Sequence, residues 1–275
     1  MKFSKRRALK IILFTPLVLF VLFYAVGVVI VQQDDRTIVE LDESPSEKVN
    51  VAIFGASGTA GDGILKAALA SADIEKVHVV TRRITPRMKR AEASGKLHVH
   101  QHMDYLDYSA VIDNLSDVDA VFWAIGINSI GVDEKTYGMI HVDFPRQFVE
   151  EWMNTSNKKE VSFHYISSSD ISDESTVMWA REKRRAEKTL FAFAEGTKMK
   201  VIAYRPDYIG PTEEDGHLGQ ELLYYFFKPV GVAVRAEQIG QAMIEATARC
   251  DEFNNRDKLH TGKITRISDA YERRH

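Results

Sequence analysis

The sequence has almost no cysteine and no marked excess of charge of either sign. Cys250 is the only cysteine among 275 residues, which excludes an internal disulfide and any zinc site built on cysteine. The formal net charge is −3, and lysine and arginine are spread along the chain instead of forming one stripe. No basic field therefore points to nucleic acid as a partner. No internal repeat is visible either.

Apolar residues are abundant near the start of the chain. Residues 11–31 form a run without a charge, long enough to cross a hydrocarbon core of about 30 Å as a helix. A basic flank at 1–10 precedes this run, and a polar, acidic linker at 32–48 follows it. A cleaved signal peptide, the alternative, usually has a shorter apolar region and a small-residue cleavage site, which is missing here. The pattern predicts one uncleaved, single-pass transmembrane helix in a lipid bilayer.

The side of the membrane on which the rest of the chain lies is left open by the sequence. Basic residues precede the apolar run, and acidic residues dominate the segment after it. The positive-inside rule therefore places the N-terminus in the cytoplasm and the remaining chain on the non-cytoplasmic side. The cytosolic supply of nicotinamide cofactors, which the motifs below imply, favours a cytoplasmic domain instead.

A glycine-rich turn follows the linker. Four apolar residues, 51–54, lead into Gly55, Gly58 and Gly61, and apolar residues then continue at helical spacing. We expect a strand, a tight turn and a helix whose N-terminus binds a pyrophosphate through unpaired backbone N–H groups. A side chain at Gly55 or Gly58 would obstruct the turn or the phosphate, and one at Gly61 would hold the helix away from the strand. A purely structural glycine turn is the alternative.

A second strand, expected at 77–80, is followed by Arg82 and Arg83. An NAD-selective site has an acidic residue at this position for the ribose 2′-hydroxyl, whereas arginine accommodates a 2′-phosphate. We therefore expect NADP in preference to NAD; the alternative is a solvated basic loop. Asp104, next to Tyr105, is expected to accept a hydrogen bond from the adenine amino group.

Strands and helices alternate after the glycine turn, which is typical of a parallel sheet with helices on both faces. We predict an α/β fold, a doubly wound parallel Rossmann domain over 49–275 with a small C-terminal, substrate-side lobe at about 207–275. Small residues at the end of the fourth strand would let the cofactor lie over it. Further strands are predicted at 97–100, 119–124, 161–166, 198–204 and 262–267, and helices at 108–115, 137–152 (with a possible kink at Pro145), 219–227 and 236–249.

Three histidines, His98, His100 and His102, alternate along the third predicted strand. Such spacing invites a metal interpretation. No cysteine or carboxylate constellation completes the site, and a surface strand explains the histidines, so we expect no metal.

Together these motifs resemble the atypical short-chain dehydrogenase/reductase superfamily, and within it the Tat-interacting-protein oxidoreductase-like group of NADPH-binding proteins. The resemblance extends over about residues 49–211 and leaves out the apolar run. It rests on the glycine turn, Arg82-Arg83, Ala124-Ile125-Gly126, Val142-Asp143-Phe144, Ile166 to Ser169, Lys183 with Ala186-Glu187, and Tyr204 to Asp207. The expected cofactor-binding residues are Gly55, Ala56, Ser57, Gly58, Thr59, Ala60, Gly61, Arg82, Arg83, Asp104, Tyr105, Ala124, Ile125, Gly126, Lys183, Arg205 and Pro206.

In enzymes of this superfamily a tyrosine four residues before a lysine is the general acid, and a serine polarises the substrate carbonyl. Lys183 is present here, and Ser168 or Ser169 matches the serine, although helix capping explains these hydroxyls equally well. Trp179 lies four residues before Lys183 on the same helix face, and indole cannot deliver a proton near neutral pH. The resemblance therefore implies complete binding residues and incomplete proton-transfer residues.

Three interpretations of the activity remain open. Another residue could supply the proton, with Tyr165, Tyr208 and Asp170 as candidates; the reaction could need no tyrosine; or the protein could be a non-enzymatic, NADP-binding regulatory or scaffold protein at the membrane. The sequence does not specify the small-molecule substrate. The loop 207–217 and the aromatic run 222–227 are expected to shape its pocket, but the run could equally form a homodimer face or a second membrane contact.

Overall fold

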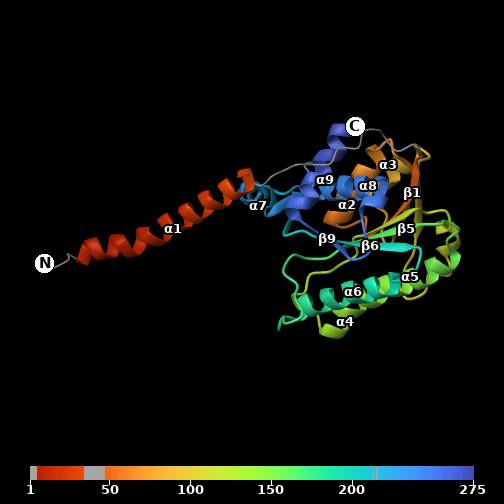
Figure 1. Cartoon of the computed structure of the whole chain (residues 1–275), viewed down its shortest axis with the longest axis horizontal. Coiled ribbons are helices and arrows are strands. Elements are labelled where there is room, and N and C mark those ends of the chain that lie inside the picture. Colours follow the sequence, from red (N-terminus) through yellow and green to blue (C-terminus); the bar gives the residue numbers. More distant parts are fainter. Residues whose placement is uncertain (1–4, 34–46, 213, 215) are drawn as a thin grey trace.

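The computed structural model of the chain describes residues 5–33, 47–212, 214 and 216–275. Within 5–33, side chains are described only for residues 15–31. Its centre is a seven-stranded parallel sheet (Figure 1). The strand order is β3-β2-β1-β4-β5-β6-β9, so the order reverses between β1 and β4. This arrangement confirms the predicted doubly wound α/β fold. The strands are β1 Val49–Phe54, β2 Ile74–Thr81, β3 Leu97–Gln101, β4 Ala120–Trp123, β5 Val161–Ile166, β6 Met199–Arg205 and β9 Asp257–His260.

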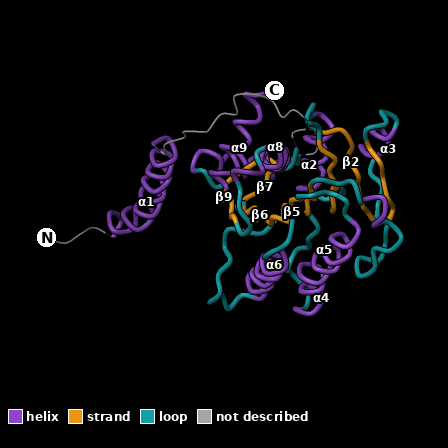
Figure 2. The backbone as a smooth tube through the Cα atoms, turned by 45° about the vertical axis from the view of Figure 1, so that its right-hand side comes forward, coloured by secondary structure: helices purple, strands orange, loops and turns teal. Residues whose placement is uncertain are grey.

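Helices cover both faces of the sheet (Figure 2). Because successive residues of a strand point to opposite faces, β1 contributes to two separate cores. Val51 and Ile53 pack in the core beneath α2, whereas Ala52 and Phe54 pack in the core beneath α5. The first face carries α2 Thr59–Ala70, α3 Pro86–Glu92, α8 Ala236–Ala248 and α9 Thr261–Arg274, and the second carries α4 Glu134–Gly138, α5 Phe144–Thr155 and α6 Met178–Ala194.

The C-terminal region is less separate than the sequence suggests. Only β7 Tyr208–Gly210, α7 Leu218–Phe227 and β8 Ala233–Arg235 lie outside the main layers, with β7 and β8 paired in a small parallel sheet of their own. The later residues return to the main domain, because β9 pairs with β6 and α8 packs on α2. The small lobe is therefore shorter than the predicted 207–275.

Two secondary-structure predictions are wrong. Residues 262–267, predicted as a strand, belong to α9, whose buried Ile264, Ile267 and Tyr271 recur at helical spacing. Of the helix predicted at 108–115, only a four-residue 3₁₀ turn, Ile112–Leu115, forms. The buried residues on both sides of this turn hold a short connection against the sheet instead of a helix.

The N-terminal helix, α1 Lys5–Gln33, projects from the body of the domain and contacts it near its C-terminal end (Figure 1). The predicted span 11–31 lies within this helix. Over the residues whose side chains the structure describes, no helix is long and apolar enough to cross a membrane. Residues 11–14 of the predicted span, and most of the linker at 32–48, lie outside that set.

Candidate cofactor and active site

The glycine turn lies at the carboxyl end of β1, next to the point where the strand order reverses. Gly55 has φ +82°, which a residue with a side chain rarely adopts, and an added Cβ would come within 2.6 Å of the Ala124 carbonyl. At Gly61, an added Cβ would overlap the Gly55 carbonyl oxygen, so this glycine allows α2 to pack against the turn, as predicted.

Gly58 behaves differently from the other two glycines. An added Cβ would meet nothing closer than the Gly55 oxygen at 3.5 Å, and the backbone angles φ −100° and ψ 167° suit any residue. The turn itself therefore does not need glycine at this position, and of the two predicted obstructions only the one to a phosphate remains for Gly58. A side chain at Gly58 would instead occupy the space in front of the α2 N-terminus, where an anion would approach.

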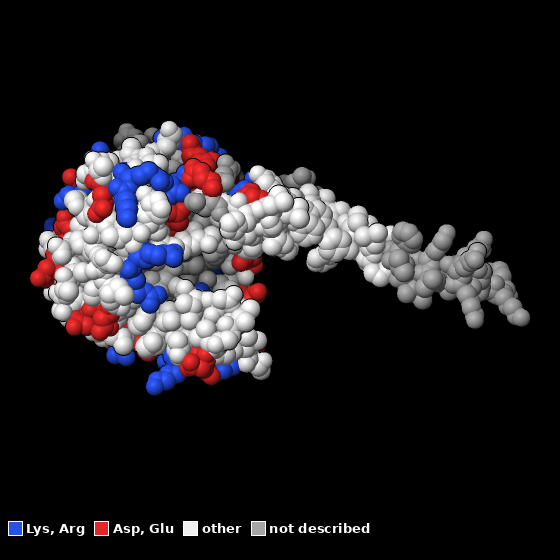
Figure 3. All heavy atoms as spheres, turned by 180° about the vertical axis from the view of Figure 1, so that it is seen from behind, with Lys and Arg blue, Asp and Glu red and all other residues white. Residues whose placement is uncertain are grey.

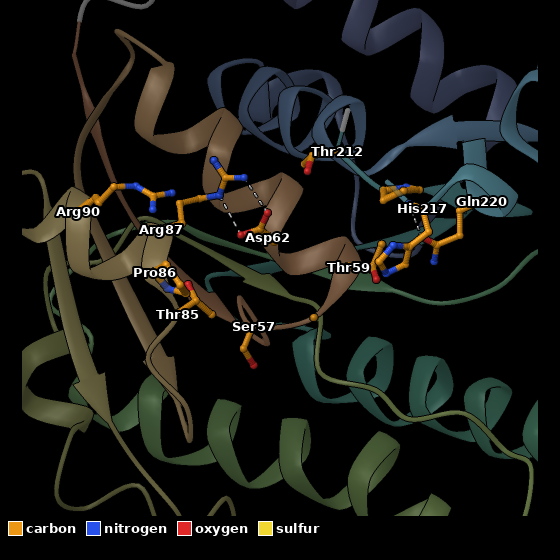
Figure 4. A pocket seen from close by; sticks show the side chains of 12 residues that line it. Ser57, Thr59, Asp62, Thr85, Pro86, Arg87, Arg90, Thr212, His217 and Gln220 are labelled. Atoms are coloured by element: carbon orange, nitrogen blue, oxygen red, sulfur yellow. Dashed lines mark hydrogen bonds and ion pairs between the residues drawn. The ribbon is translucent and has the colours of Figure 1, made fainter. Parts of the chain in front are cut away.

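The N-terminal end of α2 borders a cavity of about 340 Å³ (Figure 4). Asp62, in the first turn of α2, would repel a bound anion, but Arg87 of α3 engages both of its carboxylate oxygens at 2.9 and 3.0 Å. This ion pair neutralises the acid beside the helix N-terminus. The cavity is lined by Ser57, Gly58, Thr59, Asp62, Thr85, Pro86, Arg87, Arg90, Pro211, Thr212, His217 and Gln220.

The two arginines after β2 lie beside the glycine turn. Arg83 donates a hydrogen bond from Nη2 to the Ser57 carbonyl oxygen at 3.1 Å, and the Arg82 guanidinium lies 5.7 Å from the centre of the Tyr105 ring. Both guanidinium groups therefore border the place where the ribose of a dinucleotide would lie. A second cavity, of about 130 Å³, is bordered by Gly55, Ser57, Gly58, Thr81, Arg82, Tyr105, Ala124, Ile125 and Gly126.

The remaining predicted residues at this end lie close by. Tyr105 is buried beneath Arg82, and burial raises the pKa of its hydroxyl to about 12. The exposed Asp104 accepts a hydrogen bond from the backbone N–H of Leu106 at 2.9 Å. Ala56, which is buried, and Ala60 pack in the core beneath α2, so these two residues support the turn.

At the carboxyl end of β5, Lys183 reaches over from α6. Its Nζ donates to the carbonyl oxygens of Ile166 and Ser167, each at 3.3 Å. Burial lowers the pKa of Lys183 to about 8, although Glu187 opposes this shift. The hydroxyl of Ser167 is buried and has no hydrogen-bond partner among the described residues, whereas Ser168 and Ser169 are half-buried. Sequence reasoning missed Ser167 because only burial distinguishes it from the two serines that follow, and burial depends on tertiary contacts.

Trp179 lies in the first turn of α6, half-buried and four residues before Lys183. Of the three alternative proton donors, Tyr165 is fully buried, donates its hydroxyl to the His141 carbonyl oxygen at 3.3 Å, and has a pKa raised well above its usual value by burial. Tyr208 donates to the Gln220 carbonyl oxygen at 3.2 Å, and Asp170 is exposed. Burial therefore makes Tyr165 an unsuitable acid.

His141 is a buried residue of this site that the sequence analysis did not select. It lies in a π-helical turn, Met139–Asp143, between α4 and α5, and such turns recur at functional sites. Its ring is 4.2 Å from the ring of Tyr137, and its Nδ1 has no partner among the described residues. Burial, together with the nearby Lys183, lowers the pKa of His141 to about 3. The nearby Pro145 is the one sequence signal for this irregular turn.

Arg205 has a different role from the one expected. Its Nε and Nη2 donate to the two carboxylate oxygens of Glu187 at 2.9 and 2.5 Å, and both side chains are buried. The guanidinium group is thus committed to an internal ion pair next to Lys183. Pro206 follows at the end of β6, where its carbonyl oxygen accepts from the Ser169 N–H at 3.4 Å.

The three histidines after β2 do not share one site. His98 and His100 lie beside His78 of β2, whose Nδ1 is 3.1 Å from Nε2 of His100, and burial lowers the pKa of His78 to about 4. His102 instead stacks on Tyr108. Across the described part of the chain, no three histidine, cysteine or acidic side chains are arranged to hold a metal ion.

No protein-family profile matches this chain, and no curated protein matches it in sequence. Solved structures do match its fold. A glucose/ribitol dehydrogenase of the short-chain dehydrogenase/reductase class from Brucella melitensis superimposes with a TM-score of 0.62 at 14% identity, over 81% of this chain and 98% of that one. The chain therefore has the short-chain dehydrogenase/reductase fold.

Two further structures share this fold and contain a nicotinamide cofactor. Gre2 from Candida albicans, in complex with NADPH, matches with a TM-score of 0.59 at 15% identity over 77% of each chain. UDP-glucuronic acid 4-epimerase from Bacillus cereus, in complex with NAD, matches with a TM-score of 0.56 at 14% identity over 77% of this chain and 76% of that one. Such low identities show the fold alone and do not single out the Tat-interacting-protein oxidoreductase-like group.

The residues present fit a dinucleotide. The turn keeps an open approach at Gly58 that the protein does not itself require, and two arginines border the ribose position. Buried polar atoms without partners among the described residues are found on Ser167, at the end of β5, and on His141. Buried polar groups are normally hydrogen-bonded, so these two atoms are suited to a ligand or to water.

Proposed function

We propose that this protein binds NADP and is an oxidoreductase-like member of the short-chain dehydrogenase/reductase superfamily. The observation that carries the proposal is the position of Arg82 and Arg83 beside the glycine turn, with Arg83 bonded to the turn itself. Guanidinium groups at this point match the charge and the geometry of a 2′-phosphate. The fold and the NADPH complex of Gre2 are consistent with it.

The cofactor preference is tested by titrating the purified full chain with NADPH and NADH while nicotinamide fluorescence is followed. We expect tighter binding of NADPH, and the double variant Arg82→Ala/Arg83→Ala to lose roughly tenfold or more of NADPH affinity while NADH affinity stays unchanged. Lys89→Ala, on the exposed side of α3, is the matched control. Equal affinities for the two cofactors in the native protein would contradict the NADP assignment.

Lys183 is the central residue of the proposed chemistry at the carboxyl end of β5. Bound NADPH supplies a hydride, and the protein must orient the acceptor and deliver a proton. Lys183 is placed to bind the nicotinamide ribose, and with a pKa of about 8 its ammonium group can also release a proton near neutral pH. Ser167 is the hydroxyl placed to polarise an acceptor oxygen.

Trp179 favours a second candidate function, a non-enzymatic NADP-binding regulatory or scaffold protein. Turnover of NADPH with a panel of carbonyl and quinone acceptors separates the two. If the protein is a reductase, Lys183→Ala abolishes turnover, and Trp179→Tyr raises it by restoring the usual acid. If it is a scaffold, NADPH binds but is not oxidised by any acceptor, in the native chain or in Lys183→Ala.

We also propose that residues 11–31 attach the chain to a lipid bilayer as an N-terminal anchor. The uncharged apolar sequence of this segment supports the proposal. Flotation of the full chain with phosphatidylcholine vesicles tests it, and retention after a carbonate wash is expected. Release into the soluble fraction would contradict it.

A further inference from the structure

α7 has two unlike faces. Its inner face carries Tyr224, which is 3% exposed and lies under the Arg235 guanidinium at 3.8 Å from the ring centre. Its outer face carries large apolar side chains in contact with little else, among them Leu218 at 88% and Leu222 at 70% exposure. The spacing of Leu218, Leu222 and Tyr225 puts these three on one stripe of the helix. The contact between Tyr224 and Arg235 holds the inner face of α7 against the domain. The exposure of the outer stripe is therefore not a result of fraying of the helix.

The charge on α7 is turned away from this stripe. Glu221 is the only ionisable acid or base within Leu218–Phe227, and Arg235 holds both of its carboxylate oxygens at 2.5 and 2.8 Å. The pairing lowers the pKa of Glu221. The outer face of α7 is therefore apolar without an opposing charge, apart from Lys228 just beyond the helix end.

The apolar surface of α7 continues onto α1. Phe226 stacks on Phe20 with ring centres 6.0 Å apart, and its ring is 5.4 Å from that of Tyr24. The hydroxyl of Tyr24 donates to the Phe226 carbonyl oxygen at 2.8 Å. The two helices thus meet through aromatic side chains and form one apolar surface. In Figure 1, α7 lies next to the end of α1 that is nearest the domain.

The exposure pattern of α1 identifies what covers this surface. Every residue of Leu17–Phe23 is at least 51% exposed, and successive helix residues point about 100° apart, so the apolar exposure runs all round the helix. A protein partner, or a second copy of this chain, covers one side of a helix. A helix that is apolar on every side is buried in the core of a large protein or in a membrane. Because Leu17–Phe23 lies outside the core of this domain, we infer lipid as its covering. Residues 15–31 of α1, whose side chains the structure describes, include no charged residue, and this part of the helix is white in Figure 3.

We propose that α7 lies in the headgroup–acyl boundary of the lipid bilayer that α1 enters, with Leu218, Leu222 and Tyr225 facing lipid. Because Phe20 and Tyr24 pack on Phe226, they share this depth, and the part of α1 before Phe20 reaches deeper into the bilayer. This inference rests on the proposed bilayer attachment of residues 11–31. An apolar stripe with tyrosine and lysine at its edges is the composition that interfacial helices use, because tyrosine and lysine keep a polar end in water. The bilayer then not only holds the domain at its surface but also restricts the orientation of the domain.

The test uses a single fluorescent label in the full chain. In a Cys250→Ser background, Leu222→Cys is labelled with a polarity-sensitive dye, and the protein is reconstituted into phosphatidylcholine vesicles with and without doxyl-labelled lipid. Lys188→Cys, on the exposed side of α6, is the matched control. We expect the label at 222 to shift its emission to shorter wavelength and to lose most of its intensity with doxyl lipid, and the label at 188 to do neither.

Several results would overturn the proposal. Equal quenching at the two positions in protein that floats with vesicles shows that α7 stays in water while the anchor holds. Energy transfer between labels on different copies, without lipid quenching, shows a dimer face instead. Failure to float removes both membrane proposals at once. NADPH binding by each labelled protein shows that it is folded, and it tests the proposed cofactor separately from the membrane.

Discussion

The β1 end and the β5 end of the candidate site differ in how their geometry is made. At the β1 end, contacts of the main chain define the site: Gly55 needs its positive φ, and Gly61 lets α2 touch the turn. At the β5 end, side chains matter more: Lys183 donates to the Ser167 carbonyl oxygen, the buried His141 is close enough for the charge of Lys183 to lower its pKa, and Trp179 lies four residues before Lys183. The comparison teaches that the backbone limits which residues are allowed at the β1 end, whereas a substitution at the β5 end changes the side chains that a ligand would meet.

Removing Glu187, near the β5 end, is expected to lower the stability of the folded chain more than any other change proposed below. Glu187→Ala leaves the Arg205 guanidinium buried without its partner, at a cost of about 3–5 kcal/mol in the free energy of unfolding. The measurement is urea denaturation followed by tryptophan fluorescence. Glu195→Ala, at the C-terminal end of α6, breaks the exposed ion pair with Arg256; it is the control and should change stability little. Similar losses in the two variants would contradict a buried ion pair at Glu187.

Two glycine variants sharpen the description of the β1 end. Gly61→Val forces a side chain against the Gly55 carbonyl, and it should lose about 1–3 kcal/mol of stability together with NADPH binding. Gly58→Ala meets no such overlap, so its melting temperature should match that of the native chain while its NADPH affinity falls. Thermal unfolding and fluorescence titration check both. Native affinity in Gly58→Ala would show that no phosphate approaches this residue.

The pH dependence of the free energy of unfolding tests the burial of His141. Its pKa is about 3 in the folded chain and near 6.5 when unfolded, so below pH 6.5 the unfolded state binds the extra proton and the folded state loses stability. At one pH unit below 6.5 the loss is about 1.4 kcal/mol. His141→Gln should remove this loss from the difference between denaturation curves at pH 7 and pH 5.5. An unchanged difference would place the histidine in water.

Periodicity and turn chemistry were sufficient to predict the glycine turn and six of the seven strands of the sheet; the seventh, β9 Asp257–His260, was expected at 262–267. The bounds of β5, Val161–Ile166, were predicted correctly because apolar residues alternate with Ser162 and His164 and serines follow the last apolar residue. Local pattern could not show that Arg205 faces Glu187, since that ion pair joins different elements. Nor could it choose Ser167 from three adjacent serines, or place His141 beside Lys183 through a π turn. These features depend on tertiary contacts that no sequence window contains.

α7 connects two surfaces that would otherwise be independent. Gln220, in its first turn, lines the cavity beside the glycine turn together with His217, while its outer side chains face away from the domain. Equilibrium coupling between two ligands is reciprocal. If a bound dinucleotide changes how strongly α7 prefers lipid, lipid must change dinucleotide affinity by the same factor. Membrane composition would then act as an allosteric effector of this protein through α7.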